Sequence, residues 1–144
     1  MHVRAFSRYA LRVDALQTEE QQKPADGDAL AAQWHELLGR YHRTQCALDR
    51  ALTTEHDITV SEFEVLQQLH EAGGSMRMHA LADQVHLTQS ALSRLVSRIE
   101  EAGLVTRCVC ADDRRAASVD LTVAGESRYA AAKPTHRAIL VDLA

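Results

Sequence analysis

The sequence predicts a mostly α protein with a small β-wing, built as a winged helix-turn-helix lobe flanked by longer helices. Two observations support this prediction. Apolar residues at helical spacing on both sides of residues 85–88 indicate two short helices joined by a tight turn. Directly afterwards, two runs rich in β-branched residues, 104–109 and 116–121, surround a polar turn, which is typical of a β-hairpin.

Residues 1–27 are predicted to be an N-terminal amphipathic arm and linker. The apolar residues of the arm repeat at helical spacing, namely Val3, Phe6, Ala10, Val13 and Leu16. Residues 21–28 then have the composition of a linker and a helix start. A leader that precedes the true start codon would look the same, so both interpretations stay open.

Two helices are predicted between the linker and the helix-turn-helix. The first runs from Asp28 to about Thr53, and the second covers 59–72, where Thr59 and Glu62 fit a capping box. Gly73 and Gly74 end the second helix, and residues 75–78 suit a short strand that pairs with the hairpin. The expected inner face of the first helix consists of Leu30, Trp34, Leu37, Leu38, Tyr41, Leu48 and Leu52. That of the second consists of Phe63, Leu66 and Leu69, with Val65 alongside.

The helix-turn-helix follows from its apolar stripes and its caps. Thr88 is a good N-cap for the second short helix because its hydroxyl can accept a hydrogen bond from a first-turn amide. Gly103 is expected to end that helix in the left-handed conformation. The apolar stripes are Leu81, Ala82 and Val85 in the first helix and Leu92, Leu95, Val96 and Ile99 in the second.

The polar face of the second helix predicts contact with double-stranded DNA. Glutamine, small hydroxyls and arginine are the side chains that read base edges and bind phosphates. We expect major-groove contacts from Gln89, Ser90, Ser93 and Arg94, and phosphate contacts from Thr88 and Arg98. Ser97 lies on the same polar face and is also expected to contact DNA. The hairpin turn adds Arg114 and Arg115, which can reach a neighbouring minor groove.

A last helix is predicted after Thr122, which caps it. Pro134 is expected to break or kink this helix, since proline removes a backbone donor. Ile139, Leu140 and Leu143 then form a final apolar turn.

The net charge of −4 is unevenly distributed along the chain. Residues 28–76 carry three basic and eight acidic side chains, whereas residues 77–115 carry six arginines and five acids. Positive charge is therefore concentrated on the elements that would meet phosphate. The excess is small, so we expect moderate affinity per subunit and a clear dependence on dimerisation and salt.

These residues resemble the MarR family of winged-helix transcription regulators. The similarity covers roughly residues 59–130. It rests on residues 81–82, 87–96, 100–105, 113–116 and 119–125. The resemblance implies that Arg115 enters the minor groove and that Asp113 orients the wing. Two departures from the family pattern are His86, at a turn position usually held by glycine, and C-terminal helices that look short.

The resemblance also implies a domain organisation and a function. Residues 28–58 would be the dimerisation and effector helix, 59–121 the DNA-binding lobe and 122–144 the C-terminal dimerisation helices. We expect a homodimeric repressor that binds a pseudo-palindromic operator and is released by a small molecule. The effector site would lie between the dimer helices and the lobe, with Trp34, Tyr41 and Phe63 in its walls. No cofactor is required in this prediction.

Two other forms of regulation stay open, through a thiol or through a metal. His42, Cys46 and Asp49 recur at i, i+4 and i+7, so three potential metal ligands would share one helix face. A solvated polar face is the simpler interpretation. Cys46, and less plainly the strand residues Cys108 and Cys110, are candidate oxidation sensors.

The sequence argues against several other classes of protein. It contains no phosphate-binding loop, dinucleotide fingerprint or hydrolase motif, so we expect no enzyme. No apolar run approaches the ~20 residues that span a bilayer, and the start lacks the apolar core of a secretion signal. We therefore expect a cytoplasmic protein without a membrane partner. The competing interpretation is a winged-helix module that binds another protein and no DNA.

Overall fold

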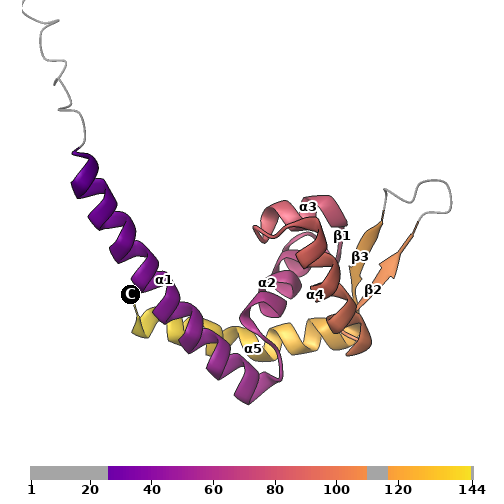
Figure 1. Cartoon of the computed structure of the whole chain (residues 1–144). Helices are drawn as coiled ribbons and strands as arrows, with labels where there is room; N and C mark the ends of the chain where they lie inside the picture. Colours follow the sequence, from indigo (N-terminus) through magenta and orange to yellow (C-terminus); the bar gives the residue numbers. More distant parts are fainter. Residues whose placement is uncertain (1–25, 110–116, 144) are drawn as a thin grey trace, which may run out of the picture. The chain divides into compact units, whose positions relative to one another are not determined.

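The computed structural model describes residues 26–109 and 117–143. The order of elements is α1 (Gly27–His56), α2 (Val60–Glu71), β1 (Ser75–Arg77), α3 (Met78–Gln84), α4 (Gln89–Glu101), β2 (Val105–Cys108), β3 (Ser118–Leu121) and α5 (Val123–Asp142), as labelled in Figure 1. The chain divides into two compact units. The boundary lies within α1, between Leu38 and Gly39. No described helix is long and apolar enough to cross a membrane. The predicted class, mostly α with a small wing, is confirmed.

The three strands form one antiparallel sheet in the order β1-β3-β2. Ser75 pairs with Asp120 and Arg77 with Ser118, while Val105 pairs with Leu121 and Cys108 with Ser118. The predicted pairing of the short strand with the hairpin is therefore confirmed. The strand is shorter than predicted, because Met78 already belongs to α3. The hairpin turn, residues 110–116, lies outside the described residues.

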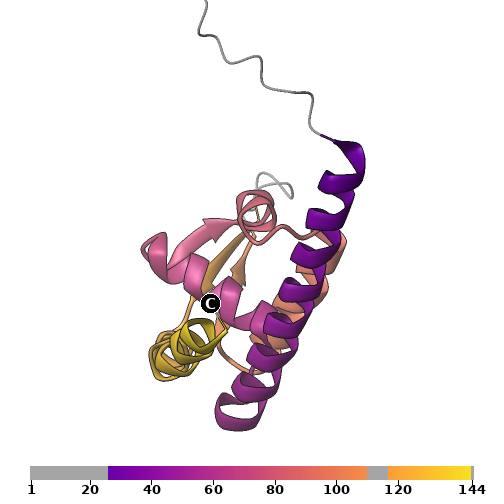
Figure 2. The same cartoon turned by 90° about the vertical axis from the view of Figure 1, so that its left-hand side faces the viewer.

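The core of the lobe forms where α2, α3, α4 and the sheet meet. Phe63, Leu66 and Leu69 of α2 are completely buried, as the predicted stripe requires. Figure 2, in which α5 is seen nearly along its axis, shows α2 next to α5, with which it packs. Each buried side chain of this size contributes about 1.5–3 kcal/mol relative to an exposed one. The other completely buried large side chains are Leu52, Ile58, Val60, Val65, Leu81, Leu92, Val96, Ile99 and Val105.

Both ends of α4 form as the sequence predicts. The Thr88 hydroxyl accepts a hydrogen bond from the Ala91 amide (3.2 Å) at the N-terminus. At the other end Gly103 has φ = 73°, and its amide donates to the Glu100 carbonyl (2.9 Å). The Leu104 amide donates to the Ile99 carbonyl (2.9 Å), which completes a Schellman motif. These caps fix where the polar face of α4 starts and stops.

The turn between α3 and α4 places a histidine where glycine is favoured. His86 has φ = 55°, the left-handed conformation that the sequence analysis requires of it. The Leu87 amide donates to the Ala82 carbonyl (3.0 Å), so α3 also ends in a Schellman arrangement. A non-glycine residue in this conformation costs about 1–2 kcal/mol. Packing of Leu87 and Val85 against the core holds the turn in place.

The predicted inner face of α1 is mostly exposed. Leu48 and Leu52 are buried, as predicted, by the second unit of the chain. Trp34 and Tyr41, however, are 60% and 63% exposed. Leu30, Leu37 and Leu38 are exposed in the same way.

The predicted break at Pro134 is wrong, because α5 continues through this residue to Asp142. Proline removes one amide donor, and the carbonyl that loses its partner belongs to Ala130, one turn earlier. Ala130 and Pro134 are both exposed, so water can satisfy that carbonyl. One continuous C-terminal helix therefore replaces the expected pair.

His136 of α5 is buried against the core. Its ring stacks on Phe63 with 4.3 Å between the ring centroids, and its Nδ1 lies 2.6 Å from Nη1 of Arg137. Burial, and then the Arg137 charge, lower the pKa of His136 below its ordinary value. Glu64 of α2 and His86 line the same cavity, and burial raises the pKa of Glu64. The fold therefore favours the neutral imidazole.

We expect the folded protein to lose stability as the pH falls below about 6.5, the ordinary pKa of histidine. In that range the unfolded chain binds a proton at His136 that the folded chain excludes, and the loss ends once the pH is below the lowered pKa. Urea unfolding at pH 7.5, 6.5 and 5.5 measures the slope. His136→Phe keeps the stack on Phe63 and should flatten it. Equal slopes for both proteins would contradict the assignment.

Candidate nucleic-acid interface

The N-terminal part of α4 presents a polar surface that the rest of the fold leaves available. Gln89, Ser90 and Arg94 are exposed. Among the described residues, Gln89 and Arg94 have no side-chain hydrogen bond or ion pair. The hydroxyl of Ser90 lies 3.3 Å from that of Thr88. Four predicted contact residues therefore share one exposed surface at the start of the helix. We call Thr88, Gln89, Ser90 and Arg94 the reading surface.

The later predicted residues of α4 are engaged inside the protein. Ser97 donates to the Ser93 carbonyl (3.0 Å) and accepts a hydrogen bond from Arg107 Nη2 (2.8 Å). Ser93 and Ser97 are half-buried. Arg98 donates from Nε and Nη2 to Glu62 Oε1 (3.1 and 2.6 Å). DNA contacts by the Ser97 and Arg98 side chains would therefore compete with internal bonds, whereas Ser93 is engaged only through its backbone carbonyl; all three stay predictions.

Arg107 of β2 is a functional candidate that the sequence analysis did not identify. Its Nη2 donates to the Ser93 carbonyl (2.5 Å) as well as to Ser97, and its amide donates to Glu100 Oε1 (2.8 Å). Nε of Arg107 lies 3.7 Å from Glu100 Oε2. These contacts fix the base of the wing to the middle of α4. In the sequence, Arg107 is distinguished only as an arginine within the β-branched run 104–109.

The wing itself is described only at its base. Asp113, Arg114, Arg115 and Cys110 lie outside the described residues. At the base, the hydroxyl of Ser75 and the thiol of Cys108 donate to the Asp120 carboxylate (2.5 and 3.0 Å). These two hydrogen bonds, from Ser75 and then from Cys108, lower the pKa of Asp120. The thiol of Cys108 therefore has a partner in the sheet, and its role as an oxidation sensor stays a prediction.

The predicted effector residues differ in their exposure, and their role stays a prediction. Phe63 is completely buried in the core, whereas Trp34 and Tyr41 are exposed. A cavity of about 240 Å³ lies on the polar side of the Phe63–His136 stack. It is lined by Glu64, Gln67, Gln68, Gln84, Val85, His86, His136 and Arg137. The sequence analysis named none of these as effector residues, because they come from three separate elements and look like ordinary surface residues.

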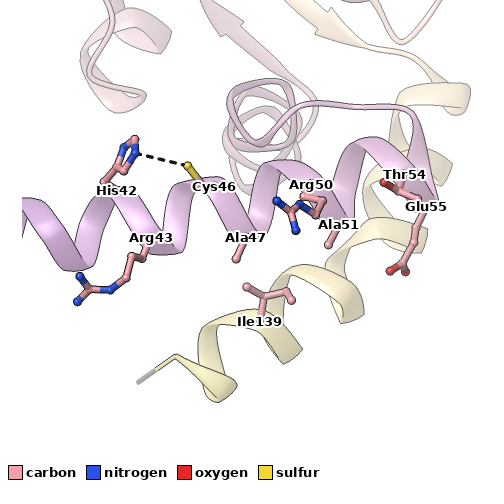
Figure 3. Close-up of a pocket in the computed structure, with 9 residues that line it drawn as sticks. All are labelled: His42, Arg43, Cys46, Ala47, Arg50, Ala51, Thr54, Glu55 and Ile139. Carbon is pink, nitrogen blue, oxygen red and sulfur yellow. Dashed lines mark hydrogen bonds between the residues drawn. The ribbon is translucent and has the colours of Figure 1, made fainter.

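The three predicted metal ligands do not converge. His42 Nε2 and Cys46 Sγ lie 3.8 Å apart on one side of α1, as Figure 3 shows. Asp49 instead accepts a hydrogen bond from the Val60 amide (3.1 Å) at the N-terminus of α2. Within residues 26–109 and 117–143, no group of three such side chains could hold a metal ion. The metal hypothesis is therefore not supported by this arrangement.

A second, larger cavity adjoins Cys46. It has a volume of about 660 Å³ and lies between α1 and α5 (Figure 3). It is lined by His42, Arg43, Cys46, Ala47, Arg50, Ala51, Thr54, Glu55 and Ile139. Cys46 is exposed there, so a reagent from solvent can reach its thiol.

Two short helices, a turn, and a hairpin fixed to the second helix define a winged helix-turn-helix protein. Its polar surface on α4 is of the kind that faces the major groove in this class. Residues 56–116 match the family model described as the MarR family, so this part of the chain is similar to the MarR-family transcription regulators. The resemblance found in the sequence is thus confirmed. Regulators of this family are DNA-binding and not enzymatic, as the sequence analysis expects of this chain.

Solved structures extend the similarity to most of the chain. AbsC, a MarR family transcriptional regulator from Streptomyces coelicolor, is 29% identical with a TM-score of 0.72, over 84% of this chain and 82% of AbsC. Sco3205 from the same organism, solved in complex with DNA, is 24% identical with a TM-score of 0.74, over 85% and 78%. Bordetella bronchiseptica BpsR, whose DNA binding is regulated by 6-hydroxynicotinic acid, is 20% identical with a TM-score of 0.72, over 78% and 83%. The last two show the fold alone.

Proposed function

We propose that the protein is a homodimeric repressor in the cytoplasm that binds a pseudo-palindromic operator in double-stranded DNA. The observation that carries this proposal is the reading surface: a glutamine, hydroxyls and an arginine stand exposed at the start of α4. Arg94 would bind guanine or phosphate, and Gln89 would read adenine. Arg115 and Arg114 would enter the minor groove beside the site, with Asp113 orienting the wing.

The dimer is supported by apolar side chains that the single chain leaves exposed. On α1 these are Leu30, Trp34, Leu37, Leu38 and Tyr41, and on α5 they are Leu140, Val141 and Leu143. Exposed apolar surface of this kind marks protein interfaces. A two-fold dimer would place two α4 helices about one DNA turn apart, in successive major grooves.

We propose that the effector binds in the 240 Å³ cavity beside the Phe63–His136 stack. The cavity touches the turn residue His86, so a ligand there contacts the segment that leads into α4. A ligand that binds only the arrangement unable to engage DNA lowers DNA affinity by linkage. That a small molecule regulates DNA binding by BpsR, a protein of this fold, supports the proposal.

A redox-regulated version of the same repressor is the second candidate. The exposed thiol of Cys46, 3.8 Å from His42 Nε2, favours it. An exposed thiol can be reached by peroxide and oxidised to the sulfenic acid. Release of DNA on treatment with peroxide, and its absence in Cys46→Ser, would establish this form of regulation.

Fluorescence anisotropy tests the proposed function. The labelled duplex is taken from the intergenic DNA upstream of the protein's own gene. We expect specific binding whose affinity falls steeply with salt, and no comparable binding to a scrambled duplex. Arg94→Ala should weaken binding and reduce the slope of log affinity against log salt by about 0.9. Arg115→Ala should weaken binding and reduce any preference for flanking A·T pairs.

The matched control is Arg40→Ala, which removes an exposed arginine from α1. This variant should leave the salt slope unchanged. If the wild-type protein prefers no native duplex, the proposal fails and the protein-interaction module takes its place. If Arg115→Ala binds the duplex as the wild type does, only the proposed minor-groove contact of the wing is contradicted.

A further inference from the structure

The carboxylate of Glu62 joins two separate parts of the lobe. Its Oε2 accepts a hydrogen bond from the Thr59 amide (2.7 Å), which completes the capping box at the start of α2. Its Oε1 accepts both hydrogen bonds from Arg98 of α4. The residue is 7% exposed. Burial alone would raise the pKa of Glu62, but the hydrogen bonds from Thr59 and Arg98 outweigh it and the pKa is lowered.

The start of α2 is also held from the side of α1. Asp49 accepts a hydrogen bond from the Val60 amide, and Ile58 in the connecting segment is buried. Asp57 turns the chain there with φ = 56°. We call residues 57–62 the α1–α2 corner. A displacement of α1 at Asp49 therefore reaches the corner, and Glu62 connects the corner to α4.

Arg98 lies four residues after Arg94, so both arginines are on one face of α4, about 6 Å apart along its axis. Arg94 has no side-chain partner among residues 26–109 and 117–143, whereas Arg98 is bound by Glu62. Fixing Arg98 fixes how α4 is rotated about its own axis. That rotation sets the direction in which Arg94 and the rest of the reading surface point.

We propose that Arg98 is a positioning residue for DNA binding, not a phosphate ligand. Its ion pair with Glu62 sets the orientation of α4 against the α1–α2 corner. The same pair transmits movements of α1 to the reading surface. This inference rests on the proposed function, since it assumes that the reading surface binds DNA.

The guanidinium of Arg98 is more than half exposed, so its attraction to Glu62 is partly screened by solvent. The pair therefore acts through the position in which it holds Arg98, and not through the strength of the attraction. Without Arg98, the nearly buried Glu62 carboxylate accepts a hydrogen bond, among the described residues, only from the Thr59 amide of the capping box. The expected response is reorientation of α4, with the lobe still folded.

The test compares Glu62→Gln, Arg98→Met and the double variant on the native duplex over a salt series. Each single change should weaken binding about tenfold, and the double variant should be no weaker than either, because residues that act through one contact are not additive. The salt slope should match that of the wild type in all three. Arg94→Ala, measured alongside, should lower the slope.

A phosphate ligand would give opposite results. Freeing Arg98 by Glu62→Gln would then leave binding unchanged or tighten it, and Arg98→Met would lower the salt slope by about 0.9. Either outcome overturns the inference while the proposed function stands. Failure of the wild-type protein to bind the duplex overturns the proposed function first.

Thr59→Ala is the matched control for the capping box. It removes the hydroxyl that accepts from the Glu62 amide (3.3 Å) and leaves the Glu62–Arg98 pair in place. DNA affinity should stay at the wild-type value, although the lobe loses about 1 kcal/mol of stability. Hydrogen exchange without DNA adds an independent readout: α4 amides should exchange faster in Glu62→Gln than in Thr59→Ala. Equal exchange in the two variants would also overturn the inference.

Discussion

Gly125→Ala is expected to lower the free energy of unfolding by about 3 kcal/mol. A Cβ atom at this position would overlap the carbonyl oxygen of Leu104 and come within 2.8 Å of Cδ1 of Leu121. The Leu104 carbonyl cannot move away freely, since it accepts a hydrogen bond from the Thr122 amide (3.1 Å). That bond connects the end of α4 to the start of α5.

Urea unfolding followed by circular dichroism measures the loss. Gly39→Ala is the control, because a Cβ there would meet only the flexible end of Arg43 at 3.3 Å. Alanine in the middle of α1 should raise stability by about 0.5–1 kcal/mol. A loss below about 1 kcal/mol for Gly125→Ala would mean that α5 shifts away from Leu104 at little cost.

Arg107→Met is expected to weaken binding to the native duplex by at least about tenfold, which corresponds to 1.4 kcal/mol. Methionine keeps most of the aliphatic stem but loses the donors to the Ser93 carbonyl and the Ser97 hydroxyl. The base of the wing is then no longer fixed to the middle of α4. The wing and the reading surface would engage the duplex as two loosely coupled parts.

Anisotropy over a salt series distinguishes this loss from the loss of a phosphate contact. Because Arg107 is half-buried behind α4, the salt slope should stay at the wild-type value. Lys133→Met removes an exposed charge from α5 and should leave binding unchanged. A slope lowered by about 0.9 in Arg107→Met would show that Arg107 contacts phosphate directly.

The features predicted correctly from the sequence depend on short-range geometry. Thr88 caps α4 and Gly103 ends it because each acts on backbone groups within five residues. The left-handed conformation of His86 agrees with the family resemblance, in which glycine usually holds this turn position. The apolar stripes of α2, α3 and α4 also located the core, since burial follows helical spacing there, whereas most of the α1 stripe is exposed.

The contacts that fix α4 could not be predicted in this way. Glu62 and Arg98 are 36 residues apart, and each looks like a solvent-facing charge in its own helix. Helical spacing predicts that Asp49 lies near Cys46. It does not reveal that Asp49 accepts a hydrogen bond from the Val60 amide at the start of α2. The metal hypothesis failed on this point. Pro134 was misjudged because spacing does not reveal that water can reach the carbonyl before it.

The strand order has a consequence for the folding pathway. The central strand, β3, is the last of the three in sequence, and Ser75 meets Asp120 across 45 residues of chain. Neither β1 nor β2 has a sheet partner until β3 has been synthesised. Closing so long a loop is entropically costly and slow. On the ribosome, α1 to α4 can therefore form before the sheet, which assembles only when β3 with Val119 has emerged.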